Sequence, residues 1–318
     1  MTEAIWLSVI VPVRNGAALL PEALDSVMRN HDQGVEVVVV DDGSTDETPT
    51  ILARYRERVP MRVIRRPGGG NWVKASNVGL AEARGQYACF LHHDDRWESG
   101  RLSAIREALA SRAVEFLVHA VWFIDDTSRR LGQWRCPLPR TGTPLPAALV
   151  LERLLVQNFI SMPAPVFPRQ AALDSGGLDE TLWHTADWDL WLRLASRGAT
   201  RYLPEPLAAF RIRATAQTVT RSHDAQDFRR QLEMVTERYL PTTNLPRRRR
   251  VAVQRAGSFS IEVNVALAML LHGQTPLWKD VIRAGWRLGP SGWHRYLRDS
   301  RIIERVLSRL RLRTRQRH

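Results

Sequence analysis

The feature that most constrains the fold is a series of short apolar runs in the first part of the chain, separated by segments with helical spacing. The four runs are residues 7–13 (LSVIVPV), 35–40 (VEVVVV), 61–64 and 87–91 (YACFL). Apolar β-branched runs without polar alternation are typical of parallel strands buried on both faces. Their alternation with helical segments predicts an α/β fold with a mostly parallel sheet flanked by helices.

Helical signals fill the segments between these runs. Apolar residues recur at helical spacing over 19–28, 51–58 and 75–83, which predicts three helices. Ser44 or Thr45 is expected to cap the second of them, with Pro49 in its first turn. Asp95 is expected to cap the helix that follows the fourth apolar run.

The chain divides at about residue 220. Before that point we expect one strand or a pair of short strands over 114–124, helices over 149–156 and 187–196, and a short strand (LAAFRIR) opened by residues 204–206. Beyond residue 221 the pattern is helical and basic, with an exposed linker over 241–250. The sequence therefore predicts an α/β domain over residues 1–220 and a basic helical C-terminal region over residues 221–318.

Charge is distributed unevenly between these two parts. Residues 221–318 hold 21 of the 46 Lys and Arg residues and 8 of the 33 Asp and Glu residues, so they account for the whole net charge of +13. From Trp286 to His318, aromatic and aliphatic residues interleave with arginines, as in helices that lie in a membrane interface. We expect this tail to contact a membrane surface; a helical appendage packed on the first domain is the alternative. No nucleic acid partner is expected.

The N-terminal sequence and the cysteines indicate the compartment. The first residues, MTEAIWLSVIVPV, lack the basic segment of a signal peptide and are expected to form a buried strand. The apolar run from Val263 to Leu271 is too short for a membrane-spanning helix. Cys89 and Cys136 are too few for a disulfide framework. We therefore expect a cytoplasmic protein, peripheral on the inner face of the cell membrane if the tail binds lipid.

Acidic and histidine residues cluster where two of the predicted strands end. Asp41 and Asp42 follow the second apolar run, and His92-His93-Asp94-Asp95 follows the fourth. In open parallel sheets, ligands bind beyond the carboxyl ends of the strands. The sequence therefore predicts that both clusters face one ligand site.

Four segments together resemble inverting family 2 glycosyltransferases of the GT-A fold, over roughly residues 7–215. They are SVIVPVRNG, VVVVDDGSTDET, KASNVGLAEARGQYACFLHHDDRW and GGLDETLWHTADWDLWLRLA, in the family's order and spacing. The resemblance implies a Rossmann-like GT-A catalytic domain, with a nucleotide-sugar half over about 1–100 and an acceptor half over about 101–220. It also implies that a sugar passes from a nucleotide-sugar, preferably a UDP-sugar, to a glycan or lipid-linked acceptor in cell-envelope polysaccharide biosynthesis.

The resemblance also implies nucleotide-binding positions. The matching residues here are Pro12, Val13, Asn15, Asp41, Asp42, Lys74, Asn77, His93 and Arg213. Asp42 is the one expected beside the nucleobase, because a carboxylate can accept the imide N–H of uracil. An ordinary loop after the first strand and a helix-capping cluster after the second are the structural alternatives.

The family's metal-binding motif is Asp-x-Asp, and the matching segment here is His92-His93-Asp94. Asp94 keeps the ligating carboxylate, while His92 replaces the first Asp. Mg²⁺ or Mn²⁺ at a leaving diphosphate prefers oxygen ligands, and Mn²⁺ also accepts imidazole. Arg213 stands where many relatives have a His, and arginine can hold a diphosphate but cannot bind a cation. The resemblance implies a divalent metal, and these departures leave metal dependence open.

The family's catalytic base corresponds to Asp187. Inversion by a single displacement needs one base on the acceptor hydroxyl. The family's Glu-Asp pair is Ala186-Asp187 here, so the Asp is kept and the Glu is missing. Because Asp187 starts a predicted helix, an N-cap is the structural alternative. The alternative functions are a non-catalytic sugar-nucleotide-binding relative and a nucleotidyltransferase, although the latter's glycine-rich basic loop is absent.

Overall fold

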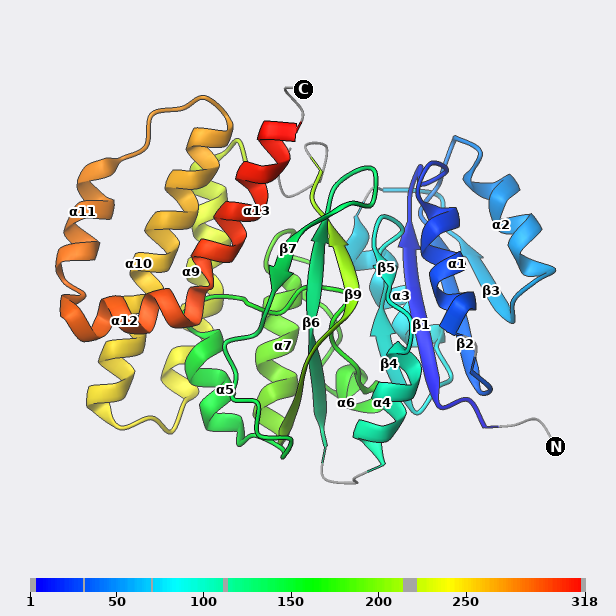
Figure 1. Cartoon of the computed structure of the whole chain (residues 1–318), viewed down its shortest axis with the longest axis horizontal. Helices are drawn as coiled ribbons and strands as arrows, with labels where there is room; N and C mark the ends of the chain where they lie inside the picture. Colours follow the sequence, from blue (N-terminus) through cyan, green and yellow to red (C-terminus); the bar gives the residue numbers. More distant parts are fainter. Residues whose placement is uncertain (1–3, 31, 70, 111–113, 214–221, 316–318) are drawn as a thin grey trace.

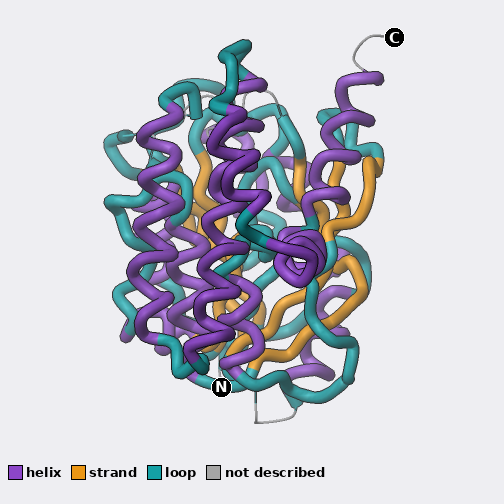
Figure 2. The backbone as a smooth tube through the Cα atoms, turned by 90° about the vertical axis from the view of Figure 1, so that its left-hand side faces the viewer, coloured by secondary structure: helices purple, strands orange, loops and turns teal. Residues whose placement is uncertain are grey.

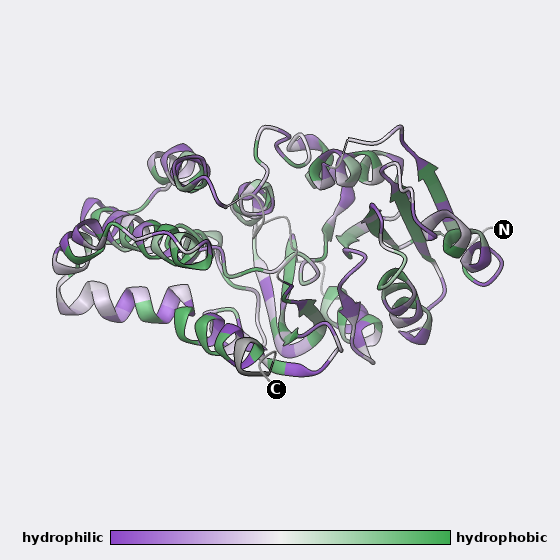
Figure 3. Ribbon diagram, turned by 90° about the horizontal axis from the view of Figure 1, so that it is seen from above, coloured by the Kyte–Doolittle hydropathy of each residue, from purple (hydrophilic) through white to green (hydrophobic). Residues whose placement is uncertain are grey.

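The computed structural model describes residues 4–30, 32–69, 71–110, 114–213 and 222–315. Two sheets and a group of helices follow one another along the longest axis of the molecule (Figure 1). Seen from above, the C-terminal helices and the first sheet lie at opposite ends, with the second sheet between them (Figure 3). The α/β architecture predicted from the sequence, with helices on a mostly parallel sheet and a helical C-terminal region, is confirmed.

The first sheet has the strand order β3-β2-β1-β4-β8. Its strands are β1 (Leu7–Val13), β2 (Val35–Asp41), β3 (Met61–Arg65), β4 (Tyr87–Phe90) and β8 (Phe167–Pro168). The four predicted strands pair in parallel, and only β8 is antiparallel. The connecting helices are α1 (Leu20–Asn30), α2 (Thr48–Arg56) and α3 (Trp72–Glu82). Parallel pairing brings the loops after β1, β2 and β4 to the same edge of the sheet.

The second sheet has the order β5-β9-β6-β7. Its strands are β5 (Arg96–Trp97), β6 (Phe116–Ile124), β7 (Arg130–Trp134) and β9 (Thr200–Arg211), and the helices of this part are α4 (Arg101–Leu109), α5 (Ala147–Leu154), α6 (Arg169–Asp174) and α7 (Ala186–Arg197). The expected short strand opened by residues 204–206 is wrong, because β9 begins at Thr200. Its prolines are tolerated where the register against β6 shifts.

The C-terminal region consists of helices. They are α9 (Ala225–Tyr239), the 3₁₀ turn η1 (Leu240–Thr242), α10 (Arg247–Leu271), α11 (Trp278–Trp286), α12 (Gly289–Ser300) and α13 (Ile302–Arg315). Helix α10 packs against α9, α11 and α12, and these helices stand in front of the strands in Figure 2. Helix α13 turns back and packs on β7. The predicted linker is shorter than expected, because α10 already begins at Arg247.

Two predicted helix caps are wrong. The N-cap of α2 is Glu47, with Pro49 in the first turn as expected. The Ser44 hydroxyl instead accepts the backbone N–H of Asn15 at 2.9 Å, and so ties the loop after β2 to the loop after β1. The N-cap of α4 is Gly100, and Asp95 instead accepts the backbone N–H of a residue in β9 at 3.0 Å. Both acidic loops therefore make contacts between segments distant in sequence.

Candidate active site

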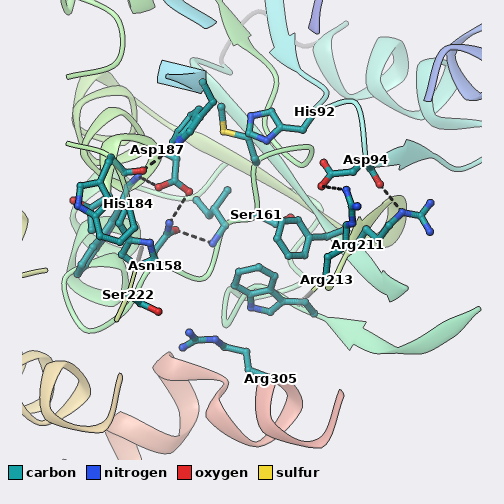
Figure 4. A pocket seen from close by; sticks show the side chains of 18 of the residues that line it. His92, Asp94, Asn158, Ser161, His184, Asp187, Arg211, Arg213, Ser222 and Arg305 are labelled. Carbon is teal, nitrogen blue, oxygen red and sulfur yellow. Dashed lines mark hydrogen bonds and ion pairs between the residues drawn. The ribbon is translucent and has the colours of Figure 1, made fainter. Parts of the chain in front are cut away.

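One cavity of about 530 Å³ opens at the carboxyl ends of β1, β2 and β4. We call it the central cavity. It lies between this edge of the first sheet, the start of α7 and the helices α10 and α13. The volume is within the range of small-molecule sites, which is about 300–1,000 Å³. Figure 4 shows Asp94 and Arg213 on one side of it, and Asp187 with Asn158 on the other.

Most of the predicted nucleotide-binding residues line the central cavity. They are Pro12, Val13, Asn15, Asp42, His93 and Arg213. The Asp42 carboxylate is buried, accepts the backbone N–H of Asn71 at 3.2 Å and lies 3.0 Å from Arg66. Gly43 follows with φ of +70°, and a Cβ there would come within 2.7 Å of Gly68. The close approach of these two loops therefore requires glycine beside Asp42.

Three predicted nucleotide-binding residues lie outside the central cavity as the described residues define it. Asp41 is buried and accepts the backbone N–H of Ser44 at 2.9 Å. Asn77 donates to the carbonyl of Leu178 at 2.8 Å and accepts that residue's N–H at 2.8 Å, so its amide joins α3 to the segment before α7. Lys74 is exposed on α3. Asp41 and Asn77 thus stabilise the loops around the cavity.

His92 lines the cavity with its Nε2 atom buried and without a hydrogen bond from any described residue. Its ring makes an edge-on contact with Trp72, with 5.3 Å between the ring centroids. Burial lowers the pKa of His92 to about 4, so the imidazole is neutral at pH 7. A neutral imidazole with a free nitrogen can accept a hydrogen bond or ligate a metal.

Arg211 and Arg213 have different roles. Arg211 is buried, and its guanidinium donates to the carbonyl oxygens of Asp94 at 2.7 Å and Asp125 at 2.5 Å and to Glu22 at 2.6 Å. Arg211 therefore holds the backbone of the loop that contains Asp94. Arg213 lies 3.9 Å from the Asp94 carboxylate, and 30% of its side chain is exposed. Its guanidinium also lies 3.4 Å from the exposed carboxylate of Asp126, so an anion at the cavity edge would compete with two carboxylates for it.

The residues around Asp94 do not form a complete metal site by themselves. Within the part of the chain that the structure describes, no group of three or more His, Cys, Asp or Glu side chains could hold a metal ion. Asp94 supplies a carboxylate and His92 a free imidazole nitrogen. These donors fit a divalent cation that takes its remaining ligands from the substrate and water.

Asp187 lies inside the first turn of α7, whose N-cap is Thr185, so the N-cap interpretation is wrong. Its carboxylate accepts the side-chain amide of Asn158 at 3.0 Å and the backbone N–H of Trp188 at 2.7 Å. Burial raises the pKa of Asp187 to about 7, although these hydrogen bonds oppose the increase. A carboxylate that ionises near pH 7 in a cavity is suited to act as a general base.

The sequence analysis missed several residues that line the cavity. An aromatic wall is formed by Phe123, Trp134 and Phe210 of the second sheet, with Phe123 and Trp134 stacked at 5.2 Å. Asn158 belongs to an irregular segment, and Arg305 and Arg309 belong to α13. No local motif marks any of these residues. Their position depends on how distant segments pack.

Comparisons with known proteins agree with this fold. Residues 8–150 match the family model for Glycosyl transferase family 2. The chain is 30% identical over 212 residues to a PGL/p-HBAD biosynthesis glycosyltransferase of Mycobacterium bovis, covering 65% of this chain and 77% of that protein.

Two solved structures are similar in fold. The S. aureus TarS 1-349 structure in complex with UDP-GlcNAc has a TM-score of 0.69 and 19% identity, over 88% of this chain and 79% of that one. The mannosyltransferase PcManGT from Pyrobaculum calidifontis, in complex with GDP-Man and Mn²⁺, has a TM-score of 0.58 and 18% identity, over 97% and 87%.

The fold and the site define a glycosyltransferase of the GT-A type. The chain belongs to glycosyltransferase family 2. The resemblance found in the sequence is thereby confirmed, and the nucleotidyltransferase alternative is not supported.

Proposed function

We propose that the protein is an inverting glycosyltransferase that moves a sugar from a nucleotide-sugar to a glycan or lipid-linked acceptor. The observation that carries this proposal is that Asp187, with a pKa of about 7, lines the same cavity as Asp42, Asp94 and Arg213. A base and the groups expected to hold the donor therefore face the same cavity. This is the arrangement that a single displacement requires.

In this mechanism the ionised Asp187 takes the proton of the acceptor hydroxyl as its oxygen attacks the anomeric carbon. The new glycosidic bond forms while the bond from the anomeric carbon to the diphosphate breaks. The electron pair of that bond leaves with the nucleoside diphosphate. The amide of Asn158, which donates to Asp187 at 3.0 Å, holds the carboxylate in place.

For the leaving group, we propose that Arg213 pairs with the diphosphate and that Asp94 and His92 hold a divalent cation together with it. Such a cation would neutralise charge on the departing diphosphate. Arg213 and Asp94 are already 3.9 Å apart, so an incoming diphosphate would meet a cation and a carboxylate side by side. The similarity in fold to a protein solved with GDP-Man and Mn²⁺ is consistent with this role for a metal.

A UDP-sugar is the proposed donor. Asp42 lines the cavity next to the loop of Pro12 to Asn15, where its carboxylate can accept the imide N–H of uracil. Adenine and cytosine lack this donor. The solved relative with UDP-GlcNAc bound supports the choice.

We also propose that the enzyme works on the cytoplasmic face of a membrane, through α11. Trp278, Ile282 and Trp286 follow one another at intervals of four residues and are 49%, 67% and 89% exposed. Lys279 and Arg283 lie beside them on the same helix, as in interfacial helices that bind anionic lipid. Among the helices described, none is long and apolar enough to cross a bilayer. We propose α11 in addition to the tail from Trp286 to His318 that the sequence predicts, in which Ile303, Leu307 and Leu310 are 57%, 45% and 50% exposed.

Part of that predicted tail packs inside the protein. Tyr296 of α12 is 3% exposed and contacts Phe259 of α10, with 4.6 Å between ring centroids. The membrane test is co-sedimentation with vesicles of phosphatidylglycerol or phosphatidylcholine. We expect binding to the anionic vesicles, and its loss when Trp278, Ile282 and Trp286 are all changed to serine. Equal binding of this variant would contradict the assignment of the surface to α11.

The transferase proposal is tested by calorimetry with UDP-, GDP- and dTDP-sugars, with and without Mn²⁺, followed by assays of sugar-nucleotide hydrolysis. We expect sugars of one nucleotide class to bind, and we expect Asp42→Ala to reduce the affinity for them. Asp187→Ala should keep donor binding and lose turnover. If no nucleotide binds, the protein is a non-catalytic relative.

A further inference from the structure

Helix α13 brings two arginines into the central cavity from the far end of the chain. Arg305 and Arg309 are four residues apart, on one face of the helix, and both line the cavity together with Asp187. In Figure 4 the guanidinium of Arg305 points toward the side of Ser222 and Asn158, away from Asp94. Arg305 therefore belongs to the half of the cavity that contains the base, and Arg309 lies one helical turn further along α13.

Among the residues that the structure describes, no carboxylate forms an ion pair with either guanidinium group. Arg305 donates to the side chain of Asn264 at 3.1 Å, while its Nη1 atom is buried without a hydrogen-bond partner among the described residues. No described ion pair involves Arg305 or Arg309. Outside the described residues, Glu3 is the only Asp or Glu in the chain.

Two other arginines with little exposure have acidic partners, whereas the buried Arg101 contacts His119 and takes part in no described ion pair. Arg211 lies 2.6 Å from Glu22, and Arg229 lies 2.5 Å from Glu262. Burial lowers the pKa of Arg305 to about 10 and also lowers that of Arg309, and both groups remain charged at pH 7. Burial of a charge without a counter-charge raises the free energy of the folded state, unless a ligand supplies the opposite charge.

The neighbouring residue His184 connects the two arginines to the catalytic segment. It stands three residues before Asp187 and also lines the cavity. Burial, followed by the positive charges of Arg305 and Arg309, lowers its pKa to about 3. His184 is therefore neutral at pH 7 and adds no third positive charge beside the two arginines.

We propose that Arg305 and Arg309 form a phosphate-binding subsite for the acceptor, so that the enzyme glycosylates a phosphate-bearing molecule. This inference rests on the proposed transferase function and specifies its acceptor. Two guanidinium groups one helical turn apart can bind the oxygens of one phosphate or of a diphosphate with charge-assisted hydrogen bonds. An acceptor held there by its phosphate would present a hydroxyl to Asp187 on the same side of the cavity.

Other residues of the cavity could contact the organic group that is esterified to such a phosphate. Leu267 and Leu271 of α10 line the cavity beside the arginines, and Leu271 is 41% exposed. They offer an apolar surface to an alkyl chain, whereas Asn264 and Ser222 offer polar contacts to a polyol. Both lipid phosphates and polyol phosphates share the phosphate chemistry, and the experiment separates them.

The test measures by calorimetry the affinity of the full-length protein for decyl phosphate, sn-glycerol 3-phosphate and UDP. The variants are Arg305→Gln/Arg309→Gln, Arg213→Gln and the control Arg255→Gln, which removes an exposed charge of α10 outside the cavity. We expect the double variant to bind the phosphate probes about 100-fold more weakly or worse, since each charge-assisted hydrogen bond contributes about tenfold or more. It should bind UDP within about twofold of wild type.

Arg213→Gln should give the opposite pattern, weaker UDP binding and unchanged phosphate binding, and Arg255→Gln should change neither. Stronger binding of decyl phosphate would identify a lipid phosphate as the source, and stronger binding of glycerol phosphate a polyol phosphate. If the double variant does not fold, Arg305→Lys and Arg309→Lys keep the charge and should each weaken phosphate binding about tenfold through loss of the bidentate geometry.

The proposal would be overturned if wild type bound neither phosphate probe at millimolar concentration, or if the double variant bound both probes with wild-type affinity. It would also be overturned if the double variant lost as much affinity for UDP as for the phosphate probes. The last would mean that the arginines hold the donor's diphosphate. Absence of UDP binding with normal phosphate binding would instead refute the proposed donor and leave the phosphate subsite in place.

Discussion

The side-chain amide of Asn158 donates a hydrogen bond to the carboxylate of Asp187 at 3.0 Å. The two residues come from different parts of the chain, an irregular segment after α5 and the first turn of α7. This hydrogen bond favours the ionised form of Asp187 and so opposes the effect of burial. The balance of the two sets the pKa of the base at about 7, in the range where a general base is most effective.

The first prediction concerns the pH dependence of transfer. Asp187 acts as a base only when ionised, so kcat/KM should fall about tenfold per pH unit below about 7 and level off above it. Asn158→Ala removes a hydrogen bond that lowers the pKa, so the acid limb should move to higher pH. Asn244→Ala, which removes an exposed amide outside the cavity, is the matched control. An unchanged acid limb in Asn158→Ala would refute the role of this hydrogen bond.

The second prediction concerns Asp187→Asn. Loss of the base should reduce transfer about 10²- to 10⁴-fold and leave donor affinity unchanged. The folded pKa is raised from 3.8 to about 7, so the folded state keeps a proton that the unfolded chain releases. Ionisation of Asp187 therefore costs stability as the pH rises from about 4 to 7.

Asp187→Asn removes that cost, so the variant should be more stable than wild type at pH 8. We expect a difference on the order of 4 kcal/mol in the free energy of unfolding at pH 8, decreasing toward pH 4. Urea denaturation at the two pH values measures it. A stability difference that is the same at pH 4 and pH 8 would contradict the raised pKa.

Much of the fold could be predicted because its signals are local. The apolar runs that became β1, β2 and β4 need only their own residues to be recognised as buried strands. The predicted helix caps are wrong because of tertiary contacts. Ser44 is a good N-cap residue, but its hydroxyl is engaged by Asn15 across the two loops. Helix-capping propensity does not predict this hydrogen bond, because its donor, the backbone N–H of Asn15, comes from the loop after a different strand.

The site was predictable only where it lies in sequence motifs. Asp42, Asp94 and Asp187 line the cavity as expected. Asn77 matched a motif equally well, yet its amide binds Leu178, because the segment before α7 packs on α3. Arg305 was counted only as part of a basic tail, and its place in the cavity depends on how α13 packs against β7. Charge counts do not show which arginines face inward.

The third prediction separates the metal from the arginine in donor binding. Asp94→Asn should abolish any stimulation of UDP binding by Mn²⁺, because it removes the anionic ligand, while it leaves binding in EDTA unchanged or stronger. Arg213→Gln should weaken binding about tenfold in EDTA as well, since it removes a charge-assisted contact to the diphosphate. Calorimetry with Mn²⁺ and with EDTA distinguishes the two. Full stimulation by Mn²⁺ in Asp94→Asn would show that the cation binds elsewhere.

The fourth prediction concerns Asp189, two residues beyond the proposed base. Its side chain is 1% exposed and accepts hydrogen bonds from Arg238 at 2.7 Å, Tyr239 at 2.7 Å and Arg193 at 2.6 Å. It therefore joins α7 to α9. Asp189→Ala leaves the partly buried Arg193 without its carboxylate partner, whereas Arg238 keeps Asp179 at 2.9 Å, and the change should cost about 3 kcal/mol in the free energy of unfolding.

Urea denaturation at pH 8 checks this value. Asp174→Ala is the control, because that carboxylate is half exposed and 4.0 Å from Arg197, and exposed ion pairs contribute at most about 1 kcal/mol. At pH 8 the two acidic residues of α7 should then have opposite effects: replacement of Asp187 stabilises the protein and replacement of Asp189 destabilises it. Two destabilising replacements would mean that Asp187, like Asp189, serves the packing of α7, and the assignment of the base would be lost.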